Sequence, residues 1–103
     1  METREGQDRE GQDREGRKQK QQATECIQRG QRHHSQAIEA RKLGQKDLAS
    51  RDFDRAIENF SEVIRLDPEH ANAYLLRARV YEEMGEDDKA EVDLTSARQL
   101  ESK

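Results

Sequence analysis

The sequence predicts an all-α fold, a short α-solenoid of two helix hairpins that follows a polar helical extension and a flexible arm. The main observation is a repeat at an offset of 34 residues: Ala56 and Ala90 are both small, and Phe60 and Leu94 are both large and apolar. A period of this length is typical of stacked hairpins, each of which buries its apolar face against a neighbour. In addition, residues 17–50 are rich in Lys, Gln, Arg, Glu and Ala, which favour helices.

Residues 1–16 form a low-complexity arm, in which the pentad Arg-Glu-Gly-Gln-Asp recurs and a Gly appears every five residues. Each Gly weakens a helix by roughly 1 kcal/mol relative to Ala. Residues 4–16 also have no apolar side chain to bury. We therefore expect the arm to be disordered on its own and to become ordered only against a partner surface.

Residues 17–36 form a polar helical extension that is expected to run into the first helix of the first hairpin. One face of this helix carries a thin stripe of small and apolar residues at intervals of three or four: Ala23, Ile27, Gly30, His34 and Ile38. Such spacing places side chains on one side of a helix. Gly30 weakens the helix and is a candidate for a break.

Residues 37–103 are expected to contain four helices in two hairpins. The first helix ends near Ala49, and Asp52 is placed to cap the second by accepting a hydrogen bond from an exposed backbone amide. The second helix covers about residues 53–66 and ends before Pro68, because Pro breaks the helical hydrogen-bond ladder.

The third and fourth helices are expected over about residues 71–84 and 88–100. Gly85 follows the third helix and can take the left-handed conformation that ends many helices. Helices of about 14 residues are roughly 21 Å long, which suits antiparallel pairs joined by short turns.

The composition excludes several classes of partner. Charged residues make up 41% of the chain, hydrophobic residues make up 30%, and the net charge is −4. Residues 37–103 contain eleven Lys or Arg and sixteen Asp or Glu, so phosphate backbones and hence nucleic acids are not expected as partners. No apolar run is long enough to span a membrane, and the start lacks the apolar core of a secretion signal. We expect an intracellular protein, cytoplasmic or cytoskeleton-associated.

The two units, residues 37–70 and 71–103, resemble tetratricopeptide repeats. The signature of that family runs aromatic, Leu-Gly, Tyr, Ala, aromatic and Pro. Matching residues of the first unit are Leu43, Gly44, Ala56, Phe60 and Pro68; those of the second are Tyr74, Ala78, Tyr81, Ala90 and Leu94. The resemblance implies stacked helix hairpins that bind other proteins, without a catalytic site or a cofactor.

In this family the first helix of each unit lines a concave groove. Carried over by register, the groove residues are Ile38, Arg41, Gln45, Leu48, Asn72, Leu75, Arg79 and Glu82. Among them, Arg41 and Arg79 could bind a peptide carboxylate, and Leu48 could seat an apolar side chain. The alternative is that these are ordinary solvated helix positions.

The C-terminal end of the solenoid is expected to stay open. Repeat proteins generally need about three units and a polar terminal cap, whereas this chain has two. Val92, Leu94 and Leu100 have no following helix to lie under. The end could be covered by the N-terminal extension, by a second copy or by a partner, and the latter two are favoured.

We therefore predict a small structural or adaptor subunit of a larger assembly. The first alternative is a co-chaperone-like module that binds peptide C-termini. Arg41, Gln45 and Leu76 align with three of its binding positions, but the remaining basic positions would fall in a third unit. The second alternative is a homo-oligomeric scaffold.

A metal-binding or enzymatic role is the least favoured prediction. Cys26, His33 and His34 do not complete the four ligands of a usual zinc site. The chain also lacks a phosphate-binding Gly loop and a nucleophile elbow. As the single cysteine, Cys26 cannot form a disulfide within the chain.

Overall fold

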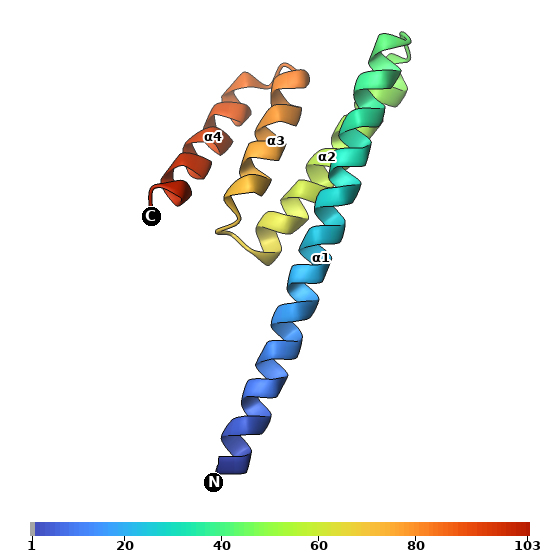
Figure 1. Ribbon diagram of the computed structural model, residues 1–103. Helices are drawn as coiled ribbons and strands as arrows, with labels where there is room; N and C mark the ends of the chain where they lie inside the picture. The colour runs from blue at the N-terminus through green and yellow to red at the C-terminus, as the bar shows by residue number, and fades with distance from the viewer. Residues whose placement is uncertain (1) are drawn as a thin grey trace.

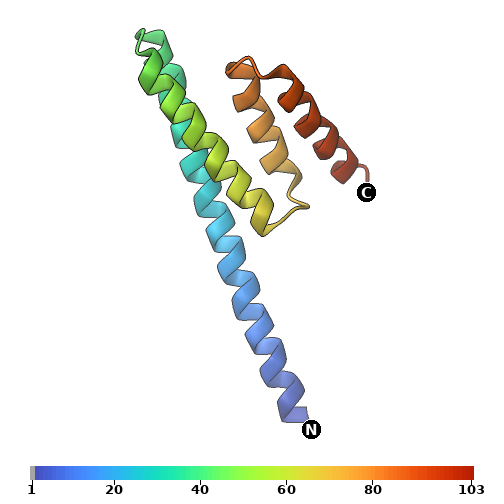
Figure 2. The ribbon, with the colours of Figure 1, turned by 180° about the vertical axis from the view of Figure 1, so that it is seen from behind.

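The computed structural model describes the backbone of residues 2–103 and the side chains from Gly16 onward. Within this part the chain forms four helices and no strand: α1 (Glu2–Lys42), α2 (Lys46–Leu66), α3 (Ala71–Glu83) and α4 (Asp87–Glu101). The helices form two hairpins that lie side by side, with α3 against α2 and α4 at the outer edge (Figure 1). The view from behind shows the same order (Figure 2). The all-α fold of helix hairpins is as predicted.

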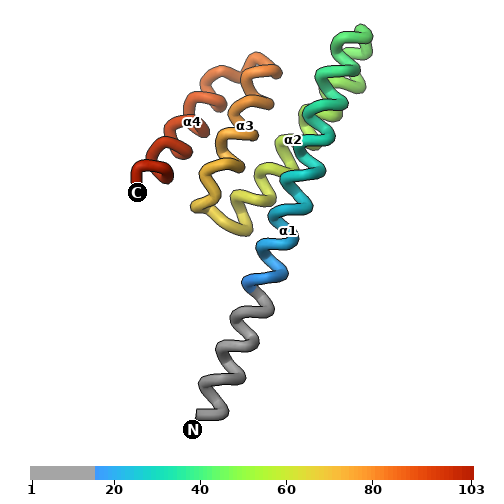
Figure 3. Tube along the Cα trace, viewed as in Figure 1, coloured from blue at the N-terminus to red at the C-terminus, as the bar shows by residue number. Residues whose placement is uncertain are grey.

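The predicted arm, residues 1–16, falls almost wholly outside the residues whose side chains are described, which are those coloured in Figure 3. Its disorder in isolation stays a prediction. Residues 17–36 lie within α1, and the helix continues through Gly30, so the predicted break is wrong. Gly30 is buried, and a Cβ atom there would lie 2.5 Å from Cε1 of Phe60. The glycine therefore allows α1 to approach α2 closely.

The turn between α1 and α2 comes earlier than predicted. Gly44 has φ +76°, its N–H donates to the carbonyl of Arg41 (3.0 Å), and the N–H of Gln45 donates to the carbonyl of Ala40 (2.9 Å). These two bonds form a Schellman motif, which ends a helix at a left-handed glycine. The prediction that the helix continues to Ala49 is therefore wrong.

Asp52 does not cap a helix. It lies in the middle of α2, and its Oδ1 is 3.3 Å from Nδ1 of His33 on α1. Only 7% of the surface of Asp52 is exposed, so this pairing supplies the partner that a buried carboxylate needs.

The second hairpin turns by the same motif at the predicted place. Gly85 has φ +78°, its N–H donates to Glu82 (3.1 Å), and the N–H of Glu86 donates to Tyr81 (2.8 Å). The two turn glycines, Gly44 and Gly85, are thus 41 residues apart although the repeat is 34. The first turn comes seven residues early, which is close to two helical turns. For this reason α2 is longer than α4 but keeps the same face buried.

The core lies among α1, α2 and α3 and is built from many small residues. Its buried members are Ala37, Ala40, Ala49, Phe53, Ala56, Phe60, Leu76 and Val80, with a smaller cluster of Ala23, Val63 and Ala73. Alanines let helices approach closely, so the few large side chains are fully enclosed. Burial of Phe60 alone contributes about 1.5–3 kcal/mol.

Candidate protein-binding surface

The structure distributes the predicted groove residues over three helices, α1, α2 and α3. Ile38 and Arg41 lie in the last turns of α1, Gln45 is the N-cap residue of α2, and Leu48 lies in the first turn of α2. The expectation that the first four positions share one helix is therefore wrong, because the chain reverses at Gly44. The other four positions, Asn72, Leu75, Arg79 and Glu82, lie on α3.

Arg41 connects α1 to the end of α3. Its Nη1 donates to the backbone carbonyl of Glu83 (3.1 Å), and its Nη2 pairs with the carboxylate of the same residue. The guanidinium carbon lies 5.5 Å from the ring centroid of Phe53. Both charged side chains keep more than a third of their surface exposed (45% and 36%), so water weakens their attraction. The pair therefore holds Arg41 in position more than it stabilises the fold.

A hollow of about 350 Å³ opens beside Arg41, where α1, α2 and α3 meet. It is lined by Arg41, Lys46, Ala49, Ser50, Phe53 and Met84, and we call it the tip groove. Its floor is apolar, because Ala49 and Phe53 are buried and Met84 is partly buried. Two leucines at the same hairpin tip are exposed, Leu43 by 67% and Leu48 by 44%, although neither of them lines the tip groove. The tip of the α1–α2 hairpin thus combines exposed apolar side chains with the two cations of the tip groove, Arg41 and Lys46.

His34 lies beneath this region with an unusual environment. Its ring centroid is 6.2 Å from that of Phe53, and its Nε2 is buried without a hydrogen-bond partner among the described residues. Burial lowers the pKa of the imidazole, and Glu83 opposes this effect. The positive charges of Arg79 and Arg41 lower the pKa further. His34 is therefore neutral at pH 7.

A partly buried ion pair, which sequence reasoning missed, joins α4 to α3, and its arginine also bonds to α2. Arg77 donates through Nε and Nη2 to the two carboxylate oxygens of Asp93 (2.8 and 2.7 Å) and through Nη1 to Oγ of Ser61 (3.1 Å). The rings of Tyr74 and Tyr81 each lie 5.8 Å from the guanidinium carbon. The hydrogen bonds to Asp93 raise the pKa of Arg77, which therefore stays charged.

One sequence signal could have revealed this pair. Asp93 lies three residues after Ala90 and four before Ala97, so it falls on the apolar stripe of its helix. An acidic residue at such a position needs a buried partner.

The open end is less apolar than predicted. Val92 is 65% exposed, whereas Leu94 and Leu100 are partly buried on α4. Around Val92 the outer face of α4 is polar, with Asp88, Glu91 and Thr95. In the described part α4 packs only on α3, so the N-terminal extension does not cover this end.

The decisive comparison is with protein families. The family profile described as tetratricopeptide repeat matches residues 47–99, which is more than half of the chain. The chain belongs to the tetratricopeptide repeat family. Searches of curated proteins and of solved structures gave no match. Tetratricopeptide repeats generally mediate protein–protein interaction.

The tetratricopeptide match begins inside α2 and ends near the close of α4, so α1 lies outside it. Among the described residues, no group of three His, Cys, Asp or Glu side chains is placed to hold a metal ion. None of the helices described has the length and apolar character needed to cross a membrane.

Proposed function

We propose that this tetratricopeptide chain is a protein-interaction module, acting as a small structural or adaptor subunit of a larger assembly. Its partner would bind the tip of the α1–α2 hairpin, over both the tip groove and the exposed leucines Leu43 and Leu48. One observation carries the proposal: two of the three large apolar side chains that are exposed in the described part, Leu43 and Leu48, lie at this tip. The third is Val92 on α4. Exposed apolar side chains at the same tip as an apolar hollow are typical of surfaces that bind proteins.

The groove suits a partner segment that presents an apolar side chain next to an acidic group. The floor of Phe53 and Met84 would receive the apolar side chain, and its burial contributes about 25 cal/mol for each Å² removed from water. Arg41 and Lys46 would attract the acidic group. Because Arg41 is already held by Glu83 and Phe53, little side-chain freedom is lost on binding.

The co-chaperone alternative has less support. Its binding positions include Leu76, which is only 8% exposed and belongs to the core. Gln45 lies in the turn after α1 and does not share a helix with Arg41.

The test replaces an exposed apolar residue by serine at each of two different surfaces. Proteins recovered with the full chain from native extract are quantified by mass spectrometry for the wild type, Leu48→Ser, Arg41→Ala and Val92→Ser. Circular dichroism verifies that each variant is folded. We expect Leu48→Ser to reduce a specific partner at least tenfold, a change of about 1.4 kcal/mol, and Val92→Ser to retain it. The proposal fails if Leu48→Ser and Arg41→Ala recover the same proteins as the wild type.

A further inference from the structure

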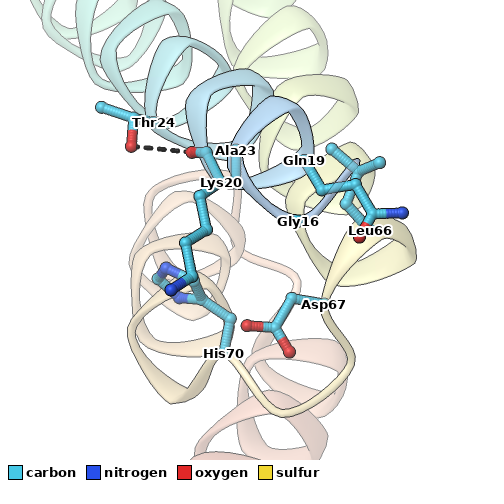
Figure 4. Close-up of a pocket in the computed structure, with 8 residues that line it drawn as sticks. All are labelled: Gly16, Gln19, Lys20, Ala23, Thr24, Leu66, Asp67 and His70. Carbon is cyan, nitrogen blue, oxygen red and sulfur yellow. Dashed lines mark hydrogen bonds between the residues drawn. The ribbon is translucent and has the colours of Figure 1, made fainter. Parts of the chain in front are cut away.

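A second hollow lies at the opposite end of the α1–α2 hairpin. Because α1 runs past Leu66, the last residue of α2, part of its inner face has no helix packed on it (Figure 1). An open cleft of about 510 Å³ lies there, between α1 and the connection from α2 to α3. Its lining includes Gln19, Lys20, Ala23, Leu66, Asp67 and His70, and we call it the overhang cleft (Figure 4).

The overhang cleft combines an apolar base with a cation that is unpaired among the residues whose side chains are described. Ala23 and Leu66 supply the apolar part. Lys20 projects from α1 toward the α2–α3 connection (Figure 4) and forms no ion pair with any residue from Gly16 onward. Asp67 and His70 are engaged locally, since Asp67 accepts from the N–H of Glu69 (3.2 Å) and His70 accepts from that of Ala73 (3.2 Å). Lys20 is therefore the group available to a ligand.

The outer face of α4 has the complementary character. Val92 is 65% exposed, and it lines a shallow hollow together with Asp88, Glu91 and Thr95. Asp88 and Thr95 lie four residues before and three residues after Val92, so they are its neighbours on the helix surface. Neither carboxylate of Asp88 or Glu91 forms an ion pair with the described residues. We call this surface the Val92 face. It presents one apolar side chain between two acidic groups.

Charge is distributed unequally between the two edges of the molecule. Residues 16–36, in α1, contain five Lys or Arg and one Asp or Glu, whereas residues 82–93 contain seven Asp or Glu and one Lys or Arg. Both views place α1 and α4 at opposite edges (Figures 1 and 2). One copy can therefore present its acidic edge to the basic edge of another without rearranging.

We propose that copies of this chain associate head to tail, with the Val92 face of one copy seated in the overhang cleft of the next. Val92 would contact Ala23 and Leu66, and Asp88 or Glu91 would pair with Lys20. The two surfaces differ, so the contact is heterologous, and each copy keeps a free surface from which a ring or an open chain can grow. The attraction between exposed charges makes the association sensitive to salt.

The experiment measures mass by analytical ultracentrifugation of the full chain across a wide concentration range. At low salt we expect the average mass of the wild type to rise with concentration. In about 1 M salt, where the Debye length is about 3 Å, the rise should be largely lost. Val92→Asp and Lys20→Glu should each abolish it, whereas Lys42→Glu, the same charge change on α1 away from the cleft, should retain it.

Mixing the two defective variants tests the head-to-tail geometry directly. Val92→Asp keeps its cleft and Lys20→Glu keeps its Val92 face, so an equimolar mixture should form a heterodimer and grow no further. Three results would overturn the inference: a wild type that stays monomeric throughout, association that survives both substitutions, or a mixture that stays monomeric. Circular dichroism melting of each variant checks that the fold is intact.

Discussion

The two hairpins end their first helices with the same glycine motif but hold their helices together by different means. In α1–α2, small residues bring the helices close, and Gly30 lies directly against the enclosed ring of Phe60. In α3–α4, the buried side chains of α4 are Ala90, Asp93 and Ala97. The paired helices there are joined by the ion pair of Asp93 with Arg77.

This difference shows two ways to close a helix hairpin in a chain with few large apolar residues. The first hairpin depends on close packing, because α1 can approach the ring of Phe60 only where Gly30 has no side chain. The second depends on charge, because Asp93 is 2% exposed and needs its partner. Each hairpin should therefore be sensitive to a different kind of substitution.

The largest effect is expected in the second hairpin. Asp93→Asn leaves the partly buried guanidinium of Arg77 without its counter-charge. Removal of one partner of a fully buried pair costs about 3–5 kcal/mol, and we expect about 2–3 kcal/mol here because 20% of the Arg77 side chain stays exposed. Urea denaturation measures the change in the free energy of unfolding. Glu101→Gln, an exposed acid-to-amide change on the same helix, should change it by less than about 0.5 kcal/mol. Equal effects of the two substitutions would refute a special role for the pair.

The turn glycines should behave alike in the two hairpins. Gly44→Ala and Gly85→Ala each force a side chain into the left-handed conformation, which costs about 1–2 kcal/mol. Thermal melting of both variants checks this. If Gly44→Ala costs much less than Gly85→Ala, the first turn has moved toward the position that a 34-residue period predicts, near Asp52. Amide hydrogen exchange over residues 43–52 would locate it.

Gly30→Ala tests close packing in the first hairpin. The added methyl group overpacks against Phe60, which lowers the free energy of unfolding by about 1–3 kcal/mol. The higher helix propensity of Ala offsets up to about 1 kcal/mol of this loss. We expect a net loss of about 1 kcal/mol by urea denaturation. Gly16→Ala is the matched control, because a Cβ atom there meets nothing within 4 Å. A stabilised Gly30→Ala variant would show that the helices can separate without cost.

The smallest effect concerns the pH dependence of stability and comes from His34 in the first hairpin. Burial lowers the pKa of His34 in the folded chain, so the unfolded chain binds the proton more readily. This contribution to stability is complete above the ordinary pKa of about 6.5 and is lost as the pH falls below it. One proton limits the slope to about 1.4 kcal/mol per pH unit. The melting temperature of His34→Gln should fall less than that of the wild type between neutral and mildly acidic pH; parallel curves would contradict the assignment.

Much of the second hairpin could be predicted from sequence. Pro68 and Gly85 are local signals that mark the start and the end of the third helix. This helix was predicted to cover about residues 71–84 and covers Ala71–Glu83. The first turn could not be predicted, because two signals compete there: Asp52 is a good cap residue and Gly44 is a good helix stop. Moving the turn by seven residues leaves the same face of the helix buried. The spacing of apolar residues therefore cannot decide between a turn at Gly44 and a turn near Asp52. The choice depends on long-range contacts such as the one between Asp52 and His33.

The candidate site was predicted only in part for the same reason. Arg41 and Leu48 were assigned to a groove by register, and both lie at the tip. Lys46, Phe53 and Met84 were missed, because they meet Arg41 only when the chain reverses at Gly44. Contacts between residues on different helices produce no periodic pattern in a single sequence, so they cannot be predicted from it.

The unequal length of the helices has one further consequence. α2 has 21 residues and α3 has 13, a difference of about 12 Å. Because a heptad rotates a helix by only about 20° from its starting direction, a hairpin can grow by whole heptads without disturbing its neighbours. Evolution can thus lengthen one member of a stack while the spacing between members stays constant. Where a long helix extends past a shorter neighbour, part of its side is left uncovered. A ligand can contact both that uncovered side and the end of the shorter helix, whereas helices of equal length offer only their ends.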